Sequence, residues 1–283
     1  KLRNMAQALA DMGTDIMPKS IGCAIIGLSE VENAKALTDL INQEPLKARG
    51  YQFCHVEGPD KRGVDCALLY NPTLFTPTDV HLYPYVQTLE KDSNYCTRGF
   101  LTVKGTMAGE EIAVIVCHWP SRFNGSFYRE QGGHQVRHLK DSLLAANPNL
   151  KIMVMGDMND DPMDKSMSEA LGAKREIKDV KEGDMYNPWW NELAKNRRGT
   201  LFYDGRWNLF DQIVFTPNML DMTGKKEFKT LTFYKHQIFR RDYLIQQEGK
   251  YKGNPKRTHA GGVWLDGYSD HLPVVVYLVK ESK

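Results

Sequence analysis

The chain has 283 residues and a formal net charge of +2, and 41% of its residues are hydrophobic and 25% charged. This composition is typical of an ordinary soluble globular protein. No apolar run reaches the length of a membrane span, so a transmembrane helix is excluded. The length allows one large domain or two smaller ones. Because the sequence has no repeat, no low-complexity linker and no clear boundary, we expect a single domain over residues 1–283.

The five cysteines show no metal-type CxxC spacing. An odd number of cysteines argues against a fully paired disulfide framework, but it does not fix the compartment. The sequence begins at Lys1, inside a helical pattern, so any export signal would already be missing. Localisation therefore stays open between secreted, periplasmic and cytoplasmic, and we expect a monomer.

Hydrophobic periodicity predicts the elements in chain order. Helices are expected at 2–12, 34–41 and 127–145, with a short one near 166–171. Strands are expected at 23–28, 51–56, 64–70, 99–104, 111–117, 151–155, 210–215 and 274–279, whereas little regular structure is expected over 220–264. Strands dominate and several neighbours look like hairpins. The mix favours an α/β fold in which two packed β-sheets are flanked by helices.

The most informative stretch surrounds Asp157. The apolar run from Lys151 to Met155 reads as a buried strand that Gly156 ends. Asp157 and Asn159 follow two residues apart, so both side chains point the same way if the strand continues. A carboxylate beside an amide suits a hard cation next to a phosphate oxygen. An Asx-rich turn after a strand is the alternative interpretation.

Other polar residues also stand at the ends of apolar strands. Glu30 lies between a strand and a helix, and His118 and His271 occupy similar places. If these ends converge on one edge of a sandwich, they form a cluster of carboxylate, amide and imidazole groups. A hydrogen-bonded structural role is the alternative for each histidine.

Five motifs in order resemble the endonuclease/exonuclease/phosphatase superfamily, the group with the DNase I-like fold. The motifs are Ser29-Glu30, His118-Trp119-Pro120-Ser121-Arg122, Gly156-Asp157-Met158-Asn159, Asp211-Gln212 and Ser269-Asp270-His271-Leu272-Pro273. The resemblance implies a four-layer sandwich of two mixed β-sheets flanked by helices. It also implies a hydrolase that cleaves phosphate esters with a divalent metal, most simply a phosphodiesterase or nuclease. The family's first strand, which carries an Asn of the site, would precede the helix at which this sequence begins.

The resemblance also implies a role for each matched residue. Glu30 and Asp270 would be carboxylates of a Mg²⁺ or Mn²⁺ site. Asp157 would orient or activate the attacking water, and Asn159 would hold the phosphate.

The same resemblance gives His271 as the catalytic imidazole and Asp211 as the buried aspartate that hydrogen-bonds it. His118 would be a second histidine beside the scissile phosphate, and Asp65 could orient it. Arg122 or Arg98 could bind phosphate, or serve equally well as ion-pair partners.

Substrate and function class stay open. A non-catalytic binding member of the same fold, or a phospholipid or inositol-phosphate phosphatase, is the alternative to a nuclease-like enzyme. Between Lys195 and Arg257 there are fourteen Lys and Arg residues against six Asp and Glu. Such a segment could border a groove for an anionic substrate, including nucleic acid, or could be ordinary solvated surface. The tryptophans at 189, 190 and 207 could stack bases or cap a core.

Overall fold

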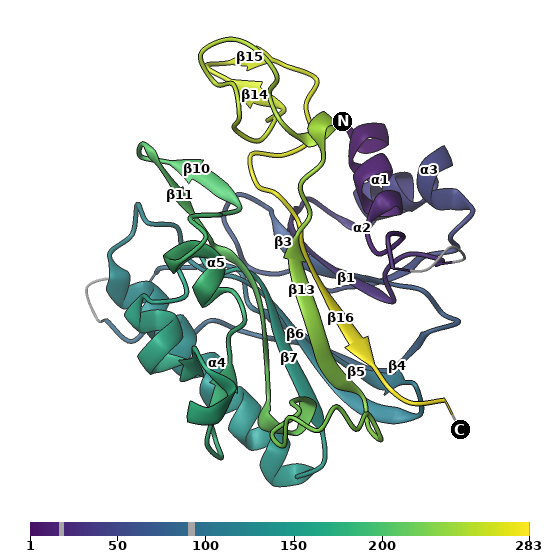
Figure 1. Ribbon diagram of the computed structural model, residues 1–283. Helices are drawn as coiled ribbons and strands as arrows, with labels where there is room; N and C mark the ends of the chain where they lie inside the picture. The colour runs from purple at the N-terminus through teal and green to yellow at the C-terminus, as the bar shows by residue number, and fades with distance from the viewer. Residues whose placement is uncertain (17–19, 90–93, 283) are drawn as a thin grey trace.

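The computed structural model describes residues 1–16, 20–89 and 94–282 (Figure 1). Its helices are α1 (Leu2–Asp11), α2 (Ala34–Ile41), α3 (Glu44–Lys47), α4 (Ser126–Ala146) and α5 (Trp190–Ala194). Its longer strands are β1 (Ile25–Val31), β2 (Gln52–His55), β3 (Asp65–Tyr70), β4 (Phe75–Tyr83), β5 (Phe100–Met107), β6 (Glu110–His118), β7 (Lys151–Asp157), β12 (Asp211–Phe215), β13 (Thr232–Ile238) and β16 (Val274–Val279). Shorter strands are β8 (Ala173–Lys174), β9 (Met185–Tyr186), β10 (Leu201–Tyr203), β11 (Arg206–Asn208), β14 (His259–Ala260) and β15 (Val263–Trp264).

The described strands form one large sheet and several smaller ladders. The large sheet has the order β4-β5-β6-β7-β12-β9-β8, and it is mixed because β6 and β7 run parallel while most other pairs are antiparallel. A smaller sheet, β1-β3-β2, and the β13–β16 ladder complete the sandwich. Strands β1 and β3 lie against β5, β6 and β7 (Figure 1).

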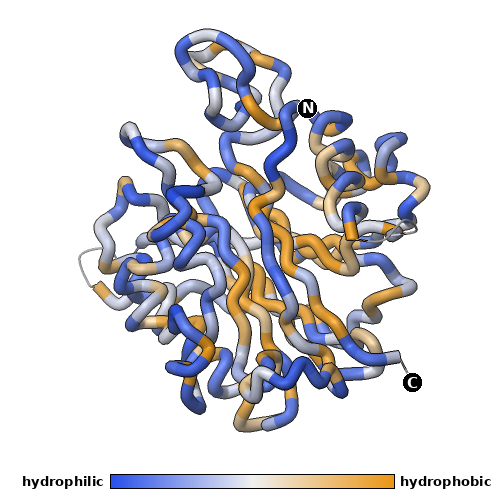
Figure 2. Tube along the Cα trace, viewed as in Figure 1, coloured by the Kyte–Doolittle hydropathy of each residue, from blue (hydrophilic) through white to orange (hydrophobic). Residues whose placement is uncertain are grey.

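Three hydrophobic cores separate four layers. One lies between the sheets, a second joins α1, α2 and α3 to the outer face of β1, β3 and β16, and a third joins α4 to the outer face of β6 and β7. Alternation along β6 shows why both faces are buried: Val114 and Val116 belong to the inter-sheet core, whereas Ile115 and Cys117 belong to the core under α4. Figure 2 shows the resulting hydrophobic central strands. The predicted four-layer fold is confirmed. None of the helices in the described part of the chain is both long and apolar enough to cross a membrane.

Two glycines allow the close packing that brings the strand ends together. A Cβ at Gly156 would stand 1.9 Å from the carbonyl oxygen of Cys117 on the neighbouring strand, and Gly156 has a φ of +135°. A Cβ at Gly27 would stand 2.7 Å from the sulfur of Met155 on the facing sheet. Larger residues at these positions would push β7 away from β6, or β1 away from β7.

Two of the longer strands, β13 and β4, were not expected from the sequence, nor were the short strands β8 to β11, β14 and β15. Residues 220–264 were expected to be irregular, but β13 crosses this segment and pairs with β16. Its polar, exposed residues, among them Tyr234 and Lys235, hide the apolar alternation that marks a half-buried strand. Strand β4 was not expected either. It lies at the edge of the large sheet, where Pro77 at a register shift leaves the pairing with β5 intact on both sides.

Candidate active site

Three of the predicted site residues lie side by side at one end of the large sheet. In the register of β6, β7 and β12, His118 is the pairing partner of Asp157, and Asp157 is the partner of Asp211. Each residue lies two positions from an inward-facing neighbour in the inter-sheet core: Val116, Met155 and Ile213. With a side-chain period of two, the three polar side chains share that face. His118, Asp157 and Asp211 therefore form a row at the edge of the sheet where β6 and β7 end and β12 begins.

His271 reaches this row from another segment of the chain. Its Nδ1 lies 2.7 Å from Oδ2 of Asp211, and an isolated bridge to Leu201 holds its backbone. Burial alone would lower the pKa of His271, but the carboxylates of Asp211 and Asp157 outweigh it and raise that pKa to about 10. His271 is therefore an imidazolium at neutral pH. With Nδ1 bound to Asp211, its Nε2–H is the donor left for a substrate.

Asp157 is the central carboxylate of the row. Burial holds its pKa above the usual range of an aspartate, although the nearby positive charge of His271 opposes the shift. Its Oδ1 accepts a hydrogen bond from the backbone N–H of Asn159 at 2.9 Å. Asn159 itself has a φ of +51° and donates its side-chain amide to the carbonyl of Trp119 at 2.8 Å. The turn after β7 thus fixes Asp157 and Asn159 together. The strand ends at Asp157, and the contact has the form of the Asx turn that was the alternative interpretation.

His118 differs in charge from His271. Its Nε2 lies 3.6 Å from Oδ2 of Asp157, beyond hydrogen-bond length, and its buried Nδ1 has no hydrogen-bond partner among the described residues. Burial, together with the positive charges of Arg98, Arg62 and His271, holds the pKa of His118 well below its usual value. His118 is therefore neutral. Asp65 does not orient it, contrary to expectation, because Asp65 lies 3.2 Å from Nε2 of His55.

The two carboxylates expected to bind metal are both exposed. Glu30 pairs with Arg62 through Oε1 at 3.3 Å, and Asp270 pairs with Arg257 at 3.4 Å. Within residues 1–16, 20–89 and 94–282, no group of three or more His, Cys, Asp or Glu side chains is placed to hold a metal. Mg²⁺ is commonly bound by one or two carboxylates together with substrate phosphates and water. Glu30 and Asp270 offer oxygen donors only and are both exposed, so their chemistry fits that kind of open site.

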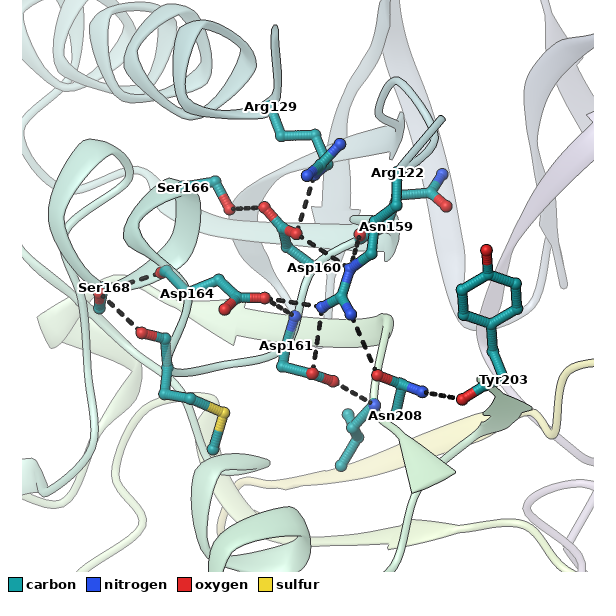
Figure 3. Close-up of polar contacts among 12 residues, drawn as sticks. Arg122, Arg129, Asn159, Asp160, Asp161, Asp164, Ser166, Ser168, Tyr203 and Asn208 are labelled. Atoms are coloured by element: carbon teal, nitrogen blue, oxygen red, sulfur yellow. Dashed lines mark hydrogen bonds and ion pairs between the residues drawn. The ribbon is translucent and has the colours of Figure 1, made fainter. Parts of the chain in front are cut away.

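Arg122 occupies a different place from the one expected of a substrate ligand. Its guanidinium donates to the carbonyl of Asn159 at 3.2 Å, to Asp161 at 3.1 Å and to Asp164 at 2.8 Å (Figure 3). It also donates to Asn208 of the β10–β11 hairpin at 3.2 Å. Arg122 lies beneath the Asn159 turn, with most of its donors used inside the protein. This arrangement favours a positioning role.

Arg98, the other arginine considered for phosphate binding, contacts two groups that were not foreseen: the side chain of Asp60 and the carbonyl of Trp119. Arg98 is buried, and it donates to Oδ2 of Asp60 at 3.1 Å and to the Trp119 carbonyl at 2.9 Å. The same carbonyl accepts from Asn159, so Arg98 and Asn159 share one acceptor. Asp60 lies in the connection between the strands expected at 51–56 and 64–70. An Asp-containing turn gives no sequence signal that separates a site residue from an ordinary turn residue.

One tryptophan, Trp189, and two basic residues, Arg240 and Arg241, make structural contacts. Trp189 is fully buried and donates its indole N–H to the carbonyl of Ile213 at 2.9 Å, so it is a core residue and the base-stacking interpretation of it was wrong. Arg240 lies over the ring of Trp207, and Arg241 pairs with Asp15 at 3.3 Å. These side chains anchor the basic segment to the body of the protein.

Comparisons with known proteins agree with this architecture. A sequence model described as Endonuclease/Exonuclease/phosphatase family matches residues 1–280. A Bacteroides thetaiotaomicron protein of that family has 18% identity and a TM-score of 0.61, with coverage of 99% of this chain and 90% of that one. A mannosyl-6-phosphatase from the same organism has 18% identity, a TM-score of 0.58 and coverage of 90% and 85%. D. rerio TDP2 complexed with single strand DNA product has 15% identity, a TM-score of 0.56 and coverage of 91% and 86%. A sequence comparison with curated proteins finds no match.

Proposed function

Because the chain belongs to the Endonuclease/Exonuclease/phosphatase family, a family of phosphoester hydrolases, we propose that it is a divalent-metal-dependent phosphodiesterase. The observation that carries the proposal is the row of His118, Asp157 and Asp211, with His271 bound to Asp211 at 2.7 Å. A protein that only binds phosphate has no need of an imidazolium and a carboxylate of raised pKa side by side. Hydrolysis uses both groups.

The proposed reaction divides the proton transfers between two groups. Asp157, whose pKa is raised by burial, accepts a proton from water, and the water oxygen forms a bond to phosphorus. The bond from phosphorus to the leaving oxygen breaks, and the Nε2–H of His271 donates its proton to that oxygen. Asp211 holds the imidazole in orientation throughout.

Two further residues bind the phosphate in this scheme. Asn159 and neutral His118 stand beside Asp157 and donate hydrogen bonds to the non-bridging oxygens. A Mg²⁺ or Mn²⁺ ion bound by Glu30 and Asp270 would neutralise charge on those oxygens. Both carboxylates now pair with arginines at the surface, and such exposed pairs are weak enough to exchange.

The substrate that this site favours is a diester on a polyanion such as nucleic acid. The β10–β11 hairpin borders His271 through Leu201, and its exposed tip carries Arg206. Arg257 lies beside Asp270 on the segment that leads into the β14–β15 hairpin. In Figure 1 both hairpins stand at the same end of the molecule. The TDP2 neighbour that carries a single strand DNA product has the same fold.

The test compares a diester with a monoester. We expect release of nitrophenol from bis(p-nitrophenyl) phosphate with Mn²⁺ or Mg²⁺, loss of that release in EDTA, and recovery when the metal is restored. A strong preference for p-nitrophenyl phosphate would select a phosphatase instead. Failure to hydrolyse either compound, with a folded protein that still binds phosphate, would select the non-catalytic binding alternative.

A further inference from the structure

An exposed arginine lies directly against the carboxylate expected to bind metal. Nη1 of Arg62 is 3.3 Å from Oε1 of Glu30, and the two side chains are 57% and 60% exposed. An ion pair so open to water contributes little to stability. The contact is therefore positioned by the fold but weak enough to be replaced.

The backbone explains why Glu30 is available to this arginine. Strand β1 alternates between faces, with Ile26 and Leu28 packed toward the helical layer. Glu30 would follow them by parity, but the pairing with β3 shifts register between Leu28 and Val31, and Glu30 has a φ of +59°. Such a bulge re-aims a side chain. Here it leaves the carboxylate exposed at the mouth of the sandwich instead of under the helices.

Arg62 is held at its base and free at its tip. The buried carboxylate of Asp60 accepts from the backbone N–H of Arg62 at 3.0 Å and lies 3.5 Å from its Nε. Asp60 is fixed in turn by the buried Arg98, which binds the Trp119 carbonyl that also accepts from Asn159. The turn that carries Arg62 is thus tied to the residue expected to hold the phosphate, while its terminal nitrogens face solvent and Glu30.

The surroundings of Arg62 also favour an anion. Arg62, Arg98 and His271 are all close enough to His118 to lower its pKa, so their positive charges converge on one place. The buried Nδ1 of His118 and Nε of Arg98 have no hydrogen-bond partner among the described residues. A guanidinium matches the geometry of phosphate oxygens and binds them with charge-assisted hydrogen bonds.

We propose that Arg62 exchanges partners during the reaction cycle: it competes with a metal ion for Glu30, and it binds a phosphate oxygen of the substrate once Glu30 ligates metal. This inference rests on the proposed metal-dependent function. On this proposal, Arg62 opposes metal binding and supports phosphate binding. One substitution should strengthen metal binding and weaken phosphate binding, whereas simple damage to the site would weaken both.

Metal binding is tested first, without substrate. We expect Arg62→Gln to bind Mn²⁺ about two- to fivefold more tightly than wild type, as measured by calorimetry. The variant lacks the exposed ion pair between Arg62 and Glu30 that the metal must displace in wild type. Lys61→Gln is the matched control, because Lys61 is the exposed neighbour with the same charge in the same turn. Equal Mn²⁺ affinity in the two variants, or weaker binding by Arg62→Gln, would overturn the inference about Arg62 but not the proposed metal dependence. Absence of Mn²⁺ binding by every variant would overturn the proposed metal dependence, and the inference with it.

Phosphate binding is tested second, at saturating Mn²⁺. The inhibition constant of inorganic phosphate against diester hydrolysis should rise about tenfold in Arg62→Gln, in keeping with the loss of a charge-assisted contact. The inhibition constant of Arg62→Lys should lie between those of wild type and Arg62→Gln, because lysine keeps the charge but lacks the planar guanidinium. Lys61→Gln should match wild type. An unchanged inhibition constant in Arg62→Gln would overturn the exchange, even if Mn²⁺ bound more tightly.

Discussion

Asp157 and Asp211 lie directly opposite each other on the neighbouring antiparallel strands β7 and β12. Like charges in that relationship destabilise a sheet. The imidazolium of His271 offsets the repulsion, because the pKa of His271 is raised by both carboxylates. The charge pattern that suits proton transfer is therefore held at the expense of stability, as is common at active sites.

Asp157→Asn should separate stability from catalysis. Because the folded-state pKa of Asp157 is raised, its titration favours folding at low pH and loses that contribution as pH rises through the folded pKa. The variant should therefore be at least as stable as wild type at pH 8, with a smaller advantage at pH 4. Turnover should fall by about 10²–10⁴. Thermal unfolding in EDTA at the two pH values checks the first part, and a variant less stable at pH 8 would contradict it.

His271 and Asp211 should act as one unit. His271→Ala should lower turnover by about a hundredfold or more. Asp211→Asn should act through the imidazole, so Asp211→Asn combined with His271→Ala should be scarcely worse than His271→Ala alone. The double-mutant cycle is measured as kcat on a chromogenic diester. Fully multiplicative losses would show that the 2.7 Å contact has no part in catalysis.

Arg122→Ala should destabilise the protein by about 3 kcal/mol, because it leaves Asp161 and Asp164 without their shared cation. The turn at Asn159 should loosen, so kcat should fall more than KM rises. Chemical denaturation and steady-state kinetics measure the two effects. A raised KM with unchanged stability would instead support the direct substrate contact that the sequence allowed.

The salt dependence of KM tests whether the β10–β11 hairpin binds a polyanionic substrate. Arg206 is exposed at the hairpin tip, whereas Arg240 and Arg241 are held by Trp207 and Asp15. KM for a single-stranded oligonucleotide should rise with salt, and Arg206→Gln should flatten that rise. Lys229→Gln is the control, since Lys229 pairs with Glu227 beside the start of β13. An unchanged slope in Arg206→Gln would identify the hairpin tip as ordinary solvated surface.

The sequence predicted the layers and most of the longer strands because runs such as β6 and β7 are almost continuously apolar and short, a pattern typical of strands buried on both faces. It also selected the residues of the row, since Asp157 and His118 stand where apolar runs stop. The Asp60, Arg62 and Arg98 network could not be foreseen. Arg98 is 38 residues from Asp60 in the sequence, and an Arg or Asp in a turn is ordinarily a surface residue. Strand β13 was missed because its exposed face interrupts the apolar pattern.

The rate of diester hydrolysis at saturating Mn²⁺ tests the central claim most directly, when wild type is compared with Asp157→Asn, His271→Ala and a control. Asp79→Asn is the control, because Asp79 is an exposed aspartate on the edge strand β4. The account predicts that Asp157→Asn and His271→Ala lose at least a hundredfold while remaining folded, and that Asp79→Asn matches wild type. Activity of Asp157→Asn within a few-fold of wild type would contradict it.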